Sequence, residues 1–120
     1  MCIRDRSKPV GPYTPAIHAG DFLMISGQIG HVDGVLVEGG LDGEAPKALE
    51  NLKKLVELEG ASLNQVVKTT VFLTDMDDYG RMNEIYCSVF DEHKPARSAV
   101  AVAALPLGAC IEIEAIVHKG

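Results

Sequence analysis

Apolar residues recur with a helical period in two segments of the chain. In residues 44–59 they form a stripe made of Ala45, Ala48, Leu49, Leu52, Leu55 and Val56. A stripe with a period of about 3.6 residues predicts an amphipathic helix. Pro46 suits the first turn of this helix and Gly60 suits its C-terminal end. A second stripe predicts a helix over about residues 77–90, and it consists of Tyr79, Met82, Ile85, Tyr86, Val89 and Phe90.

Other segments have the pattern of β-strands. They are rich in β-branched and apolar residues and lie between turn residues, at positions 22–29, 65–75, 99–104 and 110–118. Asp33-Gly34 adds a hairpin signal. The resulting order, β-β-α-β-α-β-β, predicts an α+β fold with a single mixed β-sheet and two helices packed on one of its faces.

The strand predicted at residues 99–104 is apolar in both of its alternating sets of side chains. Such a strand is expected to be covered on both faces of the sheet. Because the helices cover only one face, we expect other copies of the chain to cover the second face. The pattern therefore predicts a homo-oligomer in which sheets pack together.

Length and charge restrict the function further. A chain of 120 residues forms one domain, and its net charge of −6 disfavours a nucleic-acid partner. No apolar run approaches the roughly 20 residues that span a bilayer, and no signal peptide is visible, so we expect a cytoplasmic protein without a membrane partner. Residues 1–7, which begin with MCIRDR, resemble a cloning remnant and are predicted to be non-native or disordered, which leaves a single domain over residues 8–120.

Few residues carry recognisable chemistry. No metal cluster, phosphate-binding loop or nucleophile motif is visible, and Cys87 and Cys110 are interpreted as small core residues. Arg97 precedes the apolar strand and is either a solvated strand end or a fork that binds an anion. Glu112 and Glu114 share one face of the last strand, which is either an exposed polar face or the wall of a site.

Several motifs resemble one known family. GPYTPAI, ISGQIG, NLKKLVELEGASLNQVVKTTVFLTDMDDYGRMNEIY and PARSAVAVAALPLGACIEIEAIV together resemble the RidA (YjgF-like) family of reactive-intermediate imine deaminases, over about residues 8–118. The resemblance implies a chorismate-mutase-like fold and a homotrimer with its sites in clefts between subunits. It also implies that the reaction requires no cofactor and no metal.

The resemblance assigns roles to individual residues. It implies that Arg97 binds the substrate carboxylate and that Glu112 positions or activates water. It places in the pocket wall Tyr13, Ser26, Gly27 and Ala99. Many deaminating members have cysteine at the position of Ala99, so here only the backbone can contribute.

The activity implied is hydrolysis of 2-imino acids such as 2-iminopropanoate and 2-iminobutanoate to 2-keto acids and ammonia. The alternative is a non-catalytic trimeric module that binds small carboxylates, and the net charge of −6 disfavours a ribonuclease. If the last two strands form a simple hairpin, Arg97 and Glu112 lie roughly 17 Å apart. We therefore expect a site assembled across subunits.

Overall fold

A computed structural model describes residues 14–120 of the chain. The predicted remnant at residues 1–7 and the predicted pocket residue Tyr13 lie outside the described residues. The elements follow the order β1 (Ala16–Ala19), β2 (Phe22–Gln28), β3 (His31–Val32), β4 (Val35–Leu36), α1 (Gly40–Leu58), η1 (Leu63–Gln65), β5 (Val66–Leu73), η2 (Met76–Asp78), α2 (Tyr79–Val89), β6 (Ala96–Ala101), η3 (Pro106–Gly108) and β7 (Ile111–His118).

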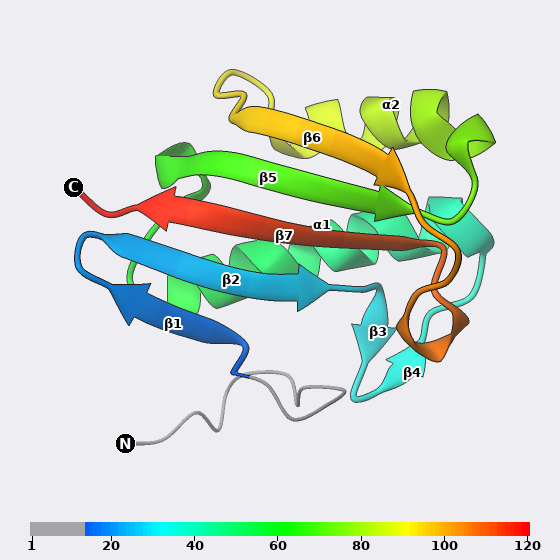
Figure 1. The fold of residues 1–120 in the computed structure, drawn as a ribbon, viewed down its shortest axis with the longest axis horizontal. Helices are drawn as coiled ribbons and strands as arrows, with labels where there is room; N and C mark the ends of the chain where they lie inside the picture. The colour runs from blue at the N-terminus through cyan, green and yellow to red at the C-terminus, as the bar shows by residue number, and fades with distance from the viewer. Residues whose placement is uncertain (1–13) are drawn as a thin grey trace.

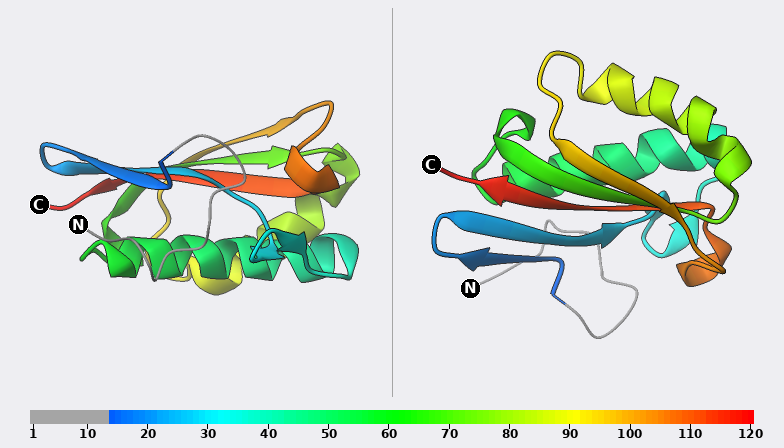
Figure 2. Two further views of the ribbon diagram at one scale, coloured as in Figure 1. Left: turned by 90° about the horizontal axis from the view of Figure 1, so that it is seen from below. Right: turned by 45° about the horizontal axis from the view of Figure 1, so that its top comes forward.

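One mixed sheet forms the centre of the molecule. Its strand order is β1-β2-β7-β5-β6, in which β5 and β6 are parallel and the other neighbours are antiparallel (Figure 1). Strands β3 and β4 form the hairpin predicted at Asp33-Gly34. Helices α1 and α2 both lie on one side of the sheet (Figure 2). The predicted α+β class, with a mixed sheet and two helices on one face, is confirmed.

The core lies between the sheet and the helices. In β7 every second residue is buried, from Ile111 to Val117, so the pleat directs an apolar row toward the helices. Leu52 of α1 and Met82 of α2 are almost completely buried against this side. None of the helices within residues 14–120 is both long and apolar enough to cross a membrane.

Helix α1 begins at Gly40, earlier than its apolar stripe predicted. Glycine disfavours a helix interior, and the sequence therefore suggested a loop before Glu44. A Cβ at Gly43 would overlap the carbonyl oxygen of Glu38, so glycine is required there by close packing. Glu44 consequently lies inside the helix, where it is buried and its Oε1 accepts a hydrogen bond from the backbone N–H of Cys110 at 2.9 Å.

The simple hairpin assumed for the last two strands in the distance argument does not form. Strand β5 lies between β6 and β7, and β6 is an edge strand that ends at Ala101. The backbone N–H of Val102 still donates to the carbonyl of Leu73, after which the chain leaves the sheet. The error arose because a parallel pair joins strands that are distant in sequence, whereas sequence adjacency favoured a hairpin.

No helix or strand within residues 14–120 covers the sheet face opposite the helices, and we call it the open face. Its strands carry exposed apolar side chains at Ile17, Phe22, Met24 and Val100, which are 57%, 44%, 39% and 42% exposed. The open face of the edge strand β6 is therefore exposed in a single chain, as the sequence interpretation expected. Several exposed apolar side chains on one sheet face are typical of an interaction face.

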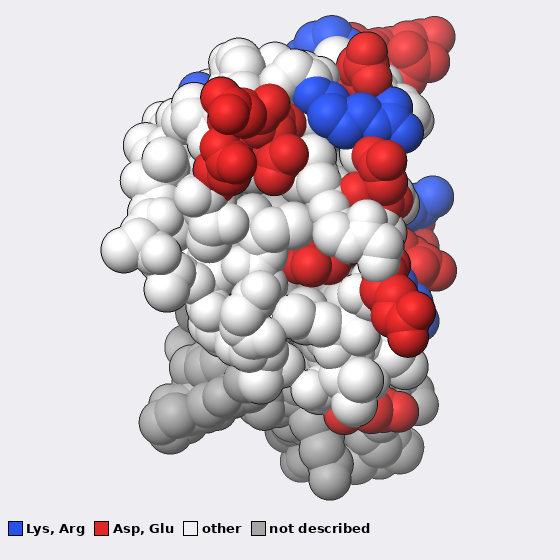
Figure 3. Space-filling view, turned by 90° about the vertical axis from the view of Figure 1, so that its right-hand side faces the viewer, with Lys and Arg blue, Asp and Glu red and all other residues white. Residues whose placement is uncertain are grey.

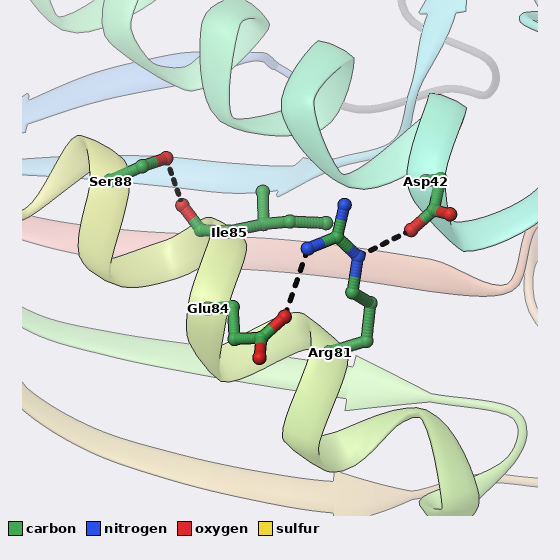
Figure 4. A network of polar contacts seen from close by, with 5 residues as sticks. All are labelled: Asp42, Arg81, Glu84, Ile85 and Ser88. Carbon is green, nitrogen blue, oxygen red and sulfur yellow. Dashed lines mark hydrogen bonds and ion pairs between the residues drawn. The ribbon is translucent and has the colours of Figure 1, made fainter.

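A polar cluster links the two helices near their N-terminal ends (Figure 4). The Nε of Arg81 donates to Asp42 Oδ1 at 2.6 Å, and its Nη1 donates to Glu84 Oε1 at 2.9 Å. These two carboxylates raise the pKa of Arg81 above its usual range. Arg81 is thus an arginine whose charge is matched by acidic partners.

Candidate functional site

Arg97 lies on the helix-facing side of the edge strand β6. Its register partner is Thr69 of β5, which is completely buried beneath α2. The guanidinium carbon of Arg97 lies 4.8 Å from the ring centroid of Tyr86 and 5.6 Å from that of Tyr79. Its Nη2 donates a hydrogen bond to the Tyr79 hydroxyl at 3.2 Å. The arginine therefore rests against aromatic faces of α2.

No carboxylate of residues 14–120 pairs with Arg97. Besides the bond to Tyr79, the guanidinium makes a weak hydrogen bond from Nη1 to Met82 Sδ at 3.8 Å. These contacts come from uncharged side chains, which do not neutralise the positive charge of the guanidinium. Arg81, by contrast, is neutralised by two carboxylates. A half-buried, unpaired guanidinium can take a carboxylate from outside the chain through two parallel hydrogen bonds.

Ala99 lies on the same side of β6 as Arg97. It is paired with Val71 and packs partly against the core. Ser98 points to the open face instead, and its Oγ accepts a hydrogen bond from the Nζ of Lys68 at 2.7 Å. Arg97 and Ala99 therefore lie on one side of the strand. We call Arg97, Ala99, Tyr79 and Tyr86 the arginine half-site.

Glu112 belongs to the other face of the sheet. Its register partner is Phe72, three positions along β5 from the partner of Arg97, and it lies on the open face. Partial burial raises the pKa of Glu112, and the neighbouring charge of Glu114 raises it further. Glu114 is exposed on the same face. The raised pKa is suited to a group that exchanges a proton with water.

Gly27 lies directly against the Glu112 carboxyl group. A Cβ at Gly27 would overlap Oε2 of Glu112 and would lie 2.6 Å from its Cδ, so only glycine allows this approach. A register shift between Ile25 and Gln28 carries Gly27 into this position. The adjacent Ser26 donates its hydroxyl to the carbonyl of Thr14 at 2.6 Å. We call Ser26, Gly27 and Glu112 the glutamate half-site.

The two half-sites do not meet within one chain. The positions of Arg97 and Glu112 differ by three residues along β5, which is about 10 Å at the usual strand rise. Their side chains also leave the sheet on opposite faces. The offset of roughly 17 Å along the strand rested on a wrong strand pairing. In the observed sheet β5 also separates the two strands, so a single chain still does not bring the two groups together.

Tyr79 and Tyr86 were interpreted from the sequence as part of the core-facing stripe of a helix. Tyr86 is indeed buried, whereas Tyr79 is 39% exposed at the edge of the arginine half-site. Residues seven apart lie two turns apart on the same helix face. That spacing could have indicated that both rings face the sheet. The local sequence did not indicate that they would contact Arg97 of β6.

The two described cysteines differ from each other. Cys110 is half-buried, and burial followed by the charge of Glu44 raises its pKa to about 12. Its thiol is therefore not activated as a nucleophile. The prediction of Cys87 as a core residue is wrong, because Cys87 is exposed on α2. Within residues 14–120, no group of three or more His, Cys, Asp or Glu side chains is arranged to hold a metal ion.

One end of the molecule is strongly acidic. Figure 3 shows acidic side chains gathered on the right-hand side of the molecule as drawn in Figure 1, where β5 ends and α2 begins. Asp75, Asp77 and Asp78 lie in this segment, and burial together with the neighbouring acids raises the pKa of Asp78. Such a surface repels phosphate groups.

Within residues 14–120, the mixed sheet has one face that no helix covers, and Arg97 on its edge strand has no acidic partner. These two features define the class: an α+β domain with an exposed sheet face and a candidate anion site. A family model described as Endoribonuclease L-PSP matches residues 3–119, and the chain therefore belongs to this family, which includes the YjgF/RidA proteins. The resemblance noted in the sequence is confirmed.

Relatives and solved structures support the same assignment. The chain is 50% identical to a RutC family protein of Pyrococcus horikoshii, over 93% of this chain and 90% of the relative. It is 48% identical to the 2-iminobutanoate/2-iminopropanoate deaminase of Mus musculus, over 92% and 84% of the two chains. RidA of a Psychrobacter species superposes with a TM-score of 0.91 at 40% identity, covering 98% and 96%. E. coli TdcF with bound serine superposes with a TM-score of 0.90 at 35% identity, covering 98% and 96%.

Proposed function

We propose that the protein hydrolyses small 2-imino acids, such as 2-iminopropanoate and 2-iminobutanoate, to 2-keto acids and ammonia. The observation that carries the proposal is the guanidinium of Arg97, which no carboxylate of residues 14–120 neutralises. A mammalian relative at 48% identity that bears the deaminase name supports the choice of substrate. The serine bound to TdcF supports a ligand that carries a carboxylate.

The proposed chemistry needs few groups. Arg97 binds the substrate carboxylate and fixes the orientation of the imine. Glu112 accepts a proton from a water molecule while the water oxygen forms a bond to the imine carbon. The π electrons of the C=N bond move to the nitrogen, which takes the proton from Glu112 and gives a carbinolamine. The hydroxyl proton of the carbinolamine then passes through Glu112 to the nitrogen, the carbon–nitrogen bond breaks as the C=O bond forms, and ammonia and the keto acid leave. The imine carbon is already electrophilic, so no covalent nucleophile is required.

We propose that the protein is a homotrimer and that the complete site combines half-sites from different chains. The open face supports this assembly through its exposed apolar side chains. The separation of Arg97 from Glu112 within one chain gives a second reason. Tyr13 is proposed as a further wall of this site, together with the backbone at Ala99.

The assembly is testable with one substitution on the open face. We expect light scattering of the parent protein to give three times the chain mass of 12.8 kDa at micromolar concentration. Val100→Asp is expected to give a folded monomer, because association would bury an unpaired carboxylate whereas in a single chain the position is 42% exposed. A parent protein that scatters as a monomer would contradict the trimer.

Gly27→Ala tests the glutamate half-site. The new Cβ must displace the carboxyl group of Glu112, the flexible end of a side chain, so we expect turnover to fall by about 10²-fold with little change in melting temperature. Gly80→Ala is the matched control, because a Cβ at that position in α2 meets nothing within 4 Å. Unchanged turnover in Gly27→Ala would remove Glu112 from the site.

A coupled assay tests the function itself. An amino-acid dehydratase generates the imine in the presence of the protein, and release of the keto acid is followed over time. We expect the protein to accelerate release above the uncatalysed rate. If pyruvate binds without any acceleration, the non-catalytic carboxylate-binding module is the correct function. The acidic surface and the net charge of −6 argue against ribonuclease activity.

A further inference from the structure

We propose that Tyr79 is a positioning residue which, together with Tyr86, holds the Arg97 guanidinium in the orientation that receives the substrate carboxylate. This inference rests on the proposed function, since it concerns how the same arginine is presented. It assigns to two residues of α2 a role that their apolar periodicity alone would explain as core packing.

The guanidinium of Arg97 contacts two aromatic rings of α2. The rings of Tyr86 and Tyr79 lie 4.8 Å and 5.6 Å from its guanidinium carbon, within the range of favourable cation–π contacts. The Tyr79 hydroxyl also accepts a hydrogen bond from Nη2 at 3.2 Å. An arginine side chain has several rotatable bonds, so ring contacts and an edge contact together restrict the rotation of its fork.

Tyr86 is itself firmly held. Its hydroxyl forms a hydrogen bond of 2.8 Å with Thr69 Oγ1, and both side chains are buried. Its ring packs on Phe90 with centroids 4.8 Å apart. Thr69 is also the register partner of Arg97, so the same position of β5 fixes the strand and the ring above it. Tyr86 therefore provides a rigid base for the guanidinium.

Tyr79 is the more exposed of the two tyrosines that contact Arg97. It begins α2, is 39% exposed and accepts the hydrogen bond from Nη2 of Arg97. Neither tyrosine neutralises the arginine, in contrast to Asp42 and Glu84, which occupy the guanidinium of Arg81. The aromatic contacts orient the fork and leave its charge available. An acid at position 79 would orient the fork as well, but it would compete with the substrate carboxylate.

The first arm of the test measures the arginine directly, without a ligand. In the complete protein, ¹⁵N relaxation of the Arg97 Nε–H group is compared between the parent, Tyr79→Leu and Tyr79→Phe. We expect the order parameter of this group to fall in Tyr79→Leu and to be largely restored in Tyr79→Phe, which keeps the ring. Leu58→Ala is the matched control, because Leu58 is a similarly exposed apolar residue at 45% and lies at the far end of α1.

The second arm measures binding of pyruvate by calorimetry. We expect Tyr79→Leu to raise the Kd about three- to tenfold and Tyr79→Phe to raise it about twofold. The melting temperatures of both variants should stay close to that of the parent, since Tyr79 is partly exposed. Leu58→Ala should leave the Kd unchanged.

The outcomes separate this inference from the proposed function. An unchanged order parameter of Arg97 in Tyr79→Leu overturns the positioning role. An unchanged Kd in Tyr79→Leu, alongside a raised Kd in Arg97→Ala, overturns the positioning role but leaves the proposed carboxylate site intact. An unchanged Kd in Arg97→Ala overturns both.

Discussion

Glu112→Gln is expected to lower imine turnover by about 10²- to 10⁴-fold, the range typical for loss of a general base. The amide has nearly the same shape as the carboxyl group but cannot accept a proton from water. Partial burial and then the charge of Glu114 raise the pKa of Glu112, which is the direction that makes a carboxylate a better proton acceptor. The coupled assay measures the loss, and circular dichroism checks that the fold is retained.

Glu114→Gln is the matched control for this substitution. Glu114 lies two residues further along β7, on the same open face, and is exposed. We expect its substitution to lower turnover only mildly, through the loss of a nearby charge. Equal losses in both variants, or no loss in either, would mean that backbone groups position the water.

The raised pKa of Glu112 also makes the free energy of unfolding depend on pH. The folded protein holds this proton more tightly than the unfolded chain, so the stability associated with the protonated group is present at low pH. That stability is lost as the pH rises through the unfolded pKa and toward the folded pKa. Glu112→Gln should therefore raise the melting temperature relative to the parent at neutral pH, and this gain should vanish in acid.

The elements of the fold were predictable where a local pattern determines them. The stripe from Ala45 to Val56 identified α1 because one helix face packs on the sheet, and alternation from Ile111 to Val117 identified β7 for the corresponding reason. The start of α1 was missed because Gly43 is explained only by the nearby backbone of Glu38. The intrinsic preference of glycine indicated a loop, and tertiary packing overrode it.

The strand order depended on contacts between distant segments. The parallel pairing of β5 with β6 brings Thr69 to Arg97, and no pattern within either strand encodes that choice. The candidate site was likewise predictable only in part. The motifs identified Arg97 and Glu112, but the approach of Gly27 to Glu112 depends on a register shift in β2. Such shifts follow from the packing of neighbouring strands and are not visible in the sequence.

Arg97→Lys is expected to damage turnover nearly as much as Arg97→Ala. Lysine keeps the positive charge but lacks the planar fork that forms two parallel hydrogen bonds with a carboxylate. Loss of one charge-assisted hydrogen bond costs about 1.5–3 kcal/mol, or roughly ten- to a hundredfold in rate. Lysine also loses the geometry that lets the guanidinium lie against Tyr86 and donate to the hydroxyl of Tyr79.

Arg81→Ala is the control that separates a binding arginine from a structural one. Arg81 belongs to α2 and is paired with Asp42 and Glu84, whereas Arg97 contacts α2 from β6 and pairs with no acid within residues 14–120. We expect Arg81→Ala to leave turnover and pyruvate binding close to those of the parent. If Arg97 merely closed a strand end, Arg97→Lys would retain activity and any loss would appear in the melting temperature. Pyruvate binding that survives Arg97→Ala would show that the carboxylate is held elsewhere, because alanine has no donor that could bind it.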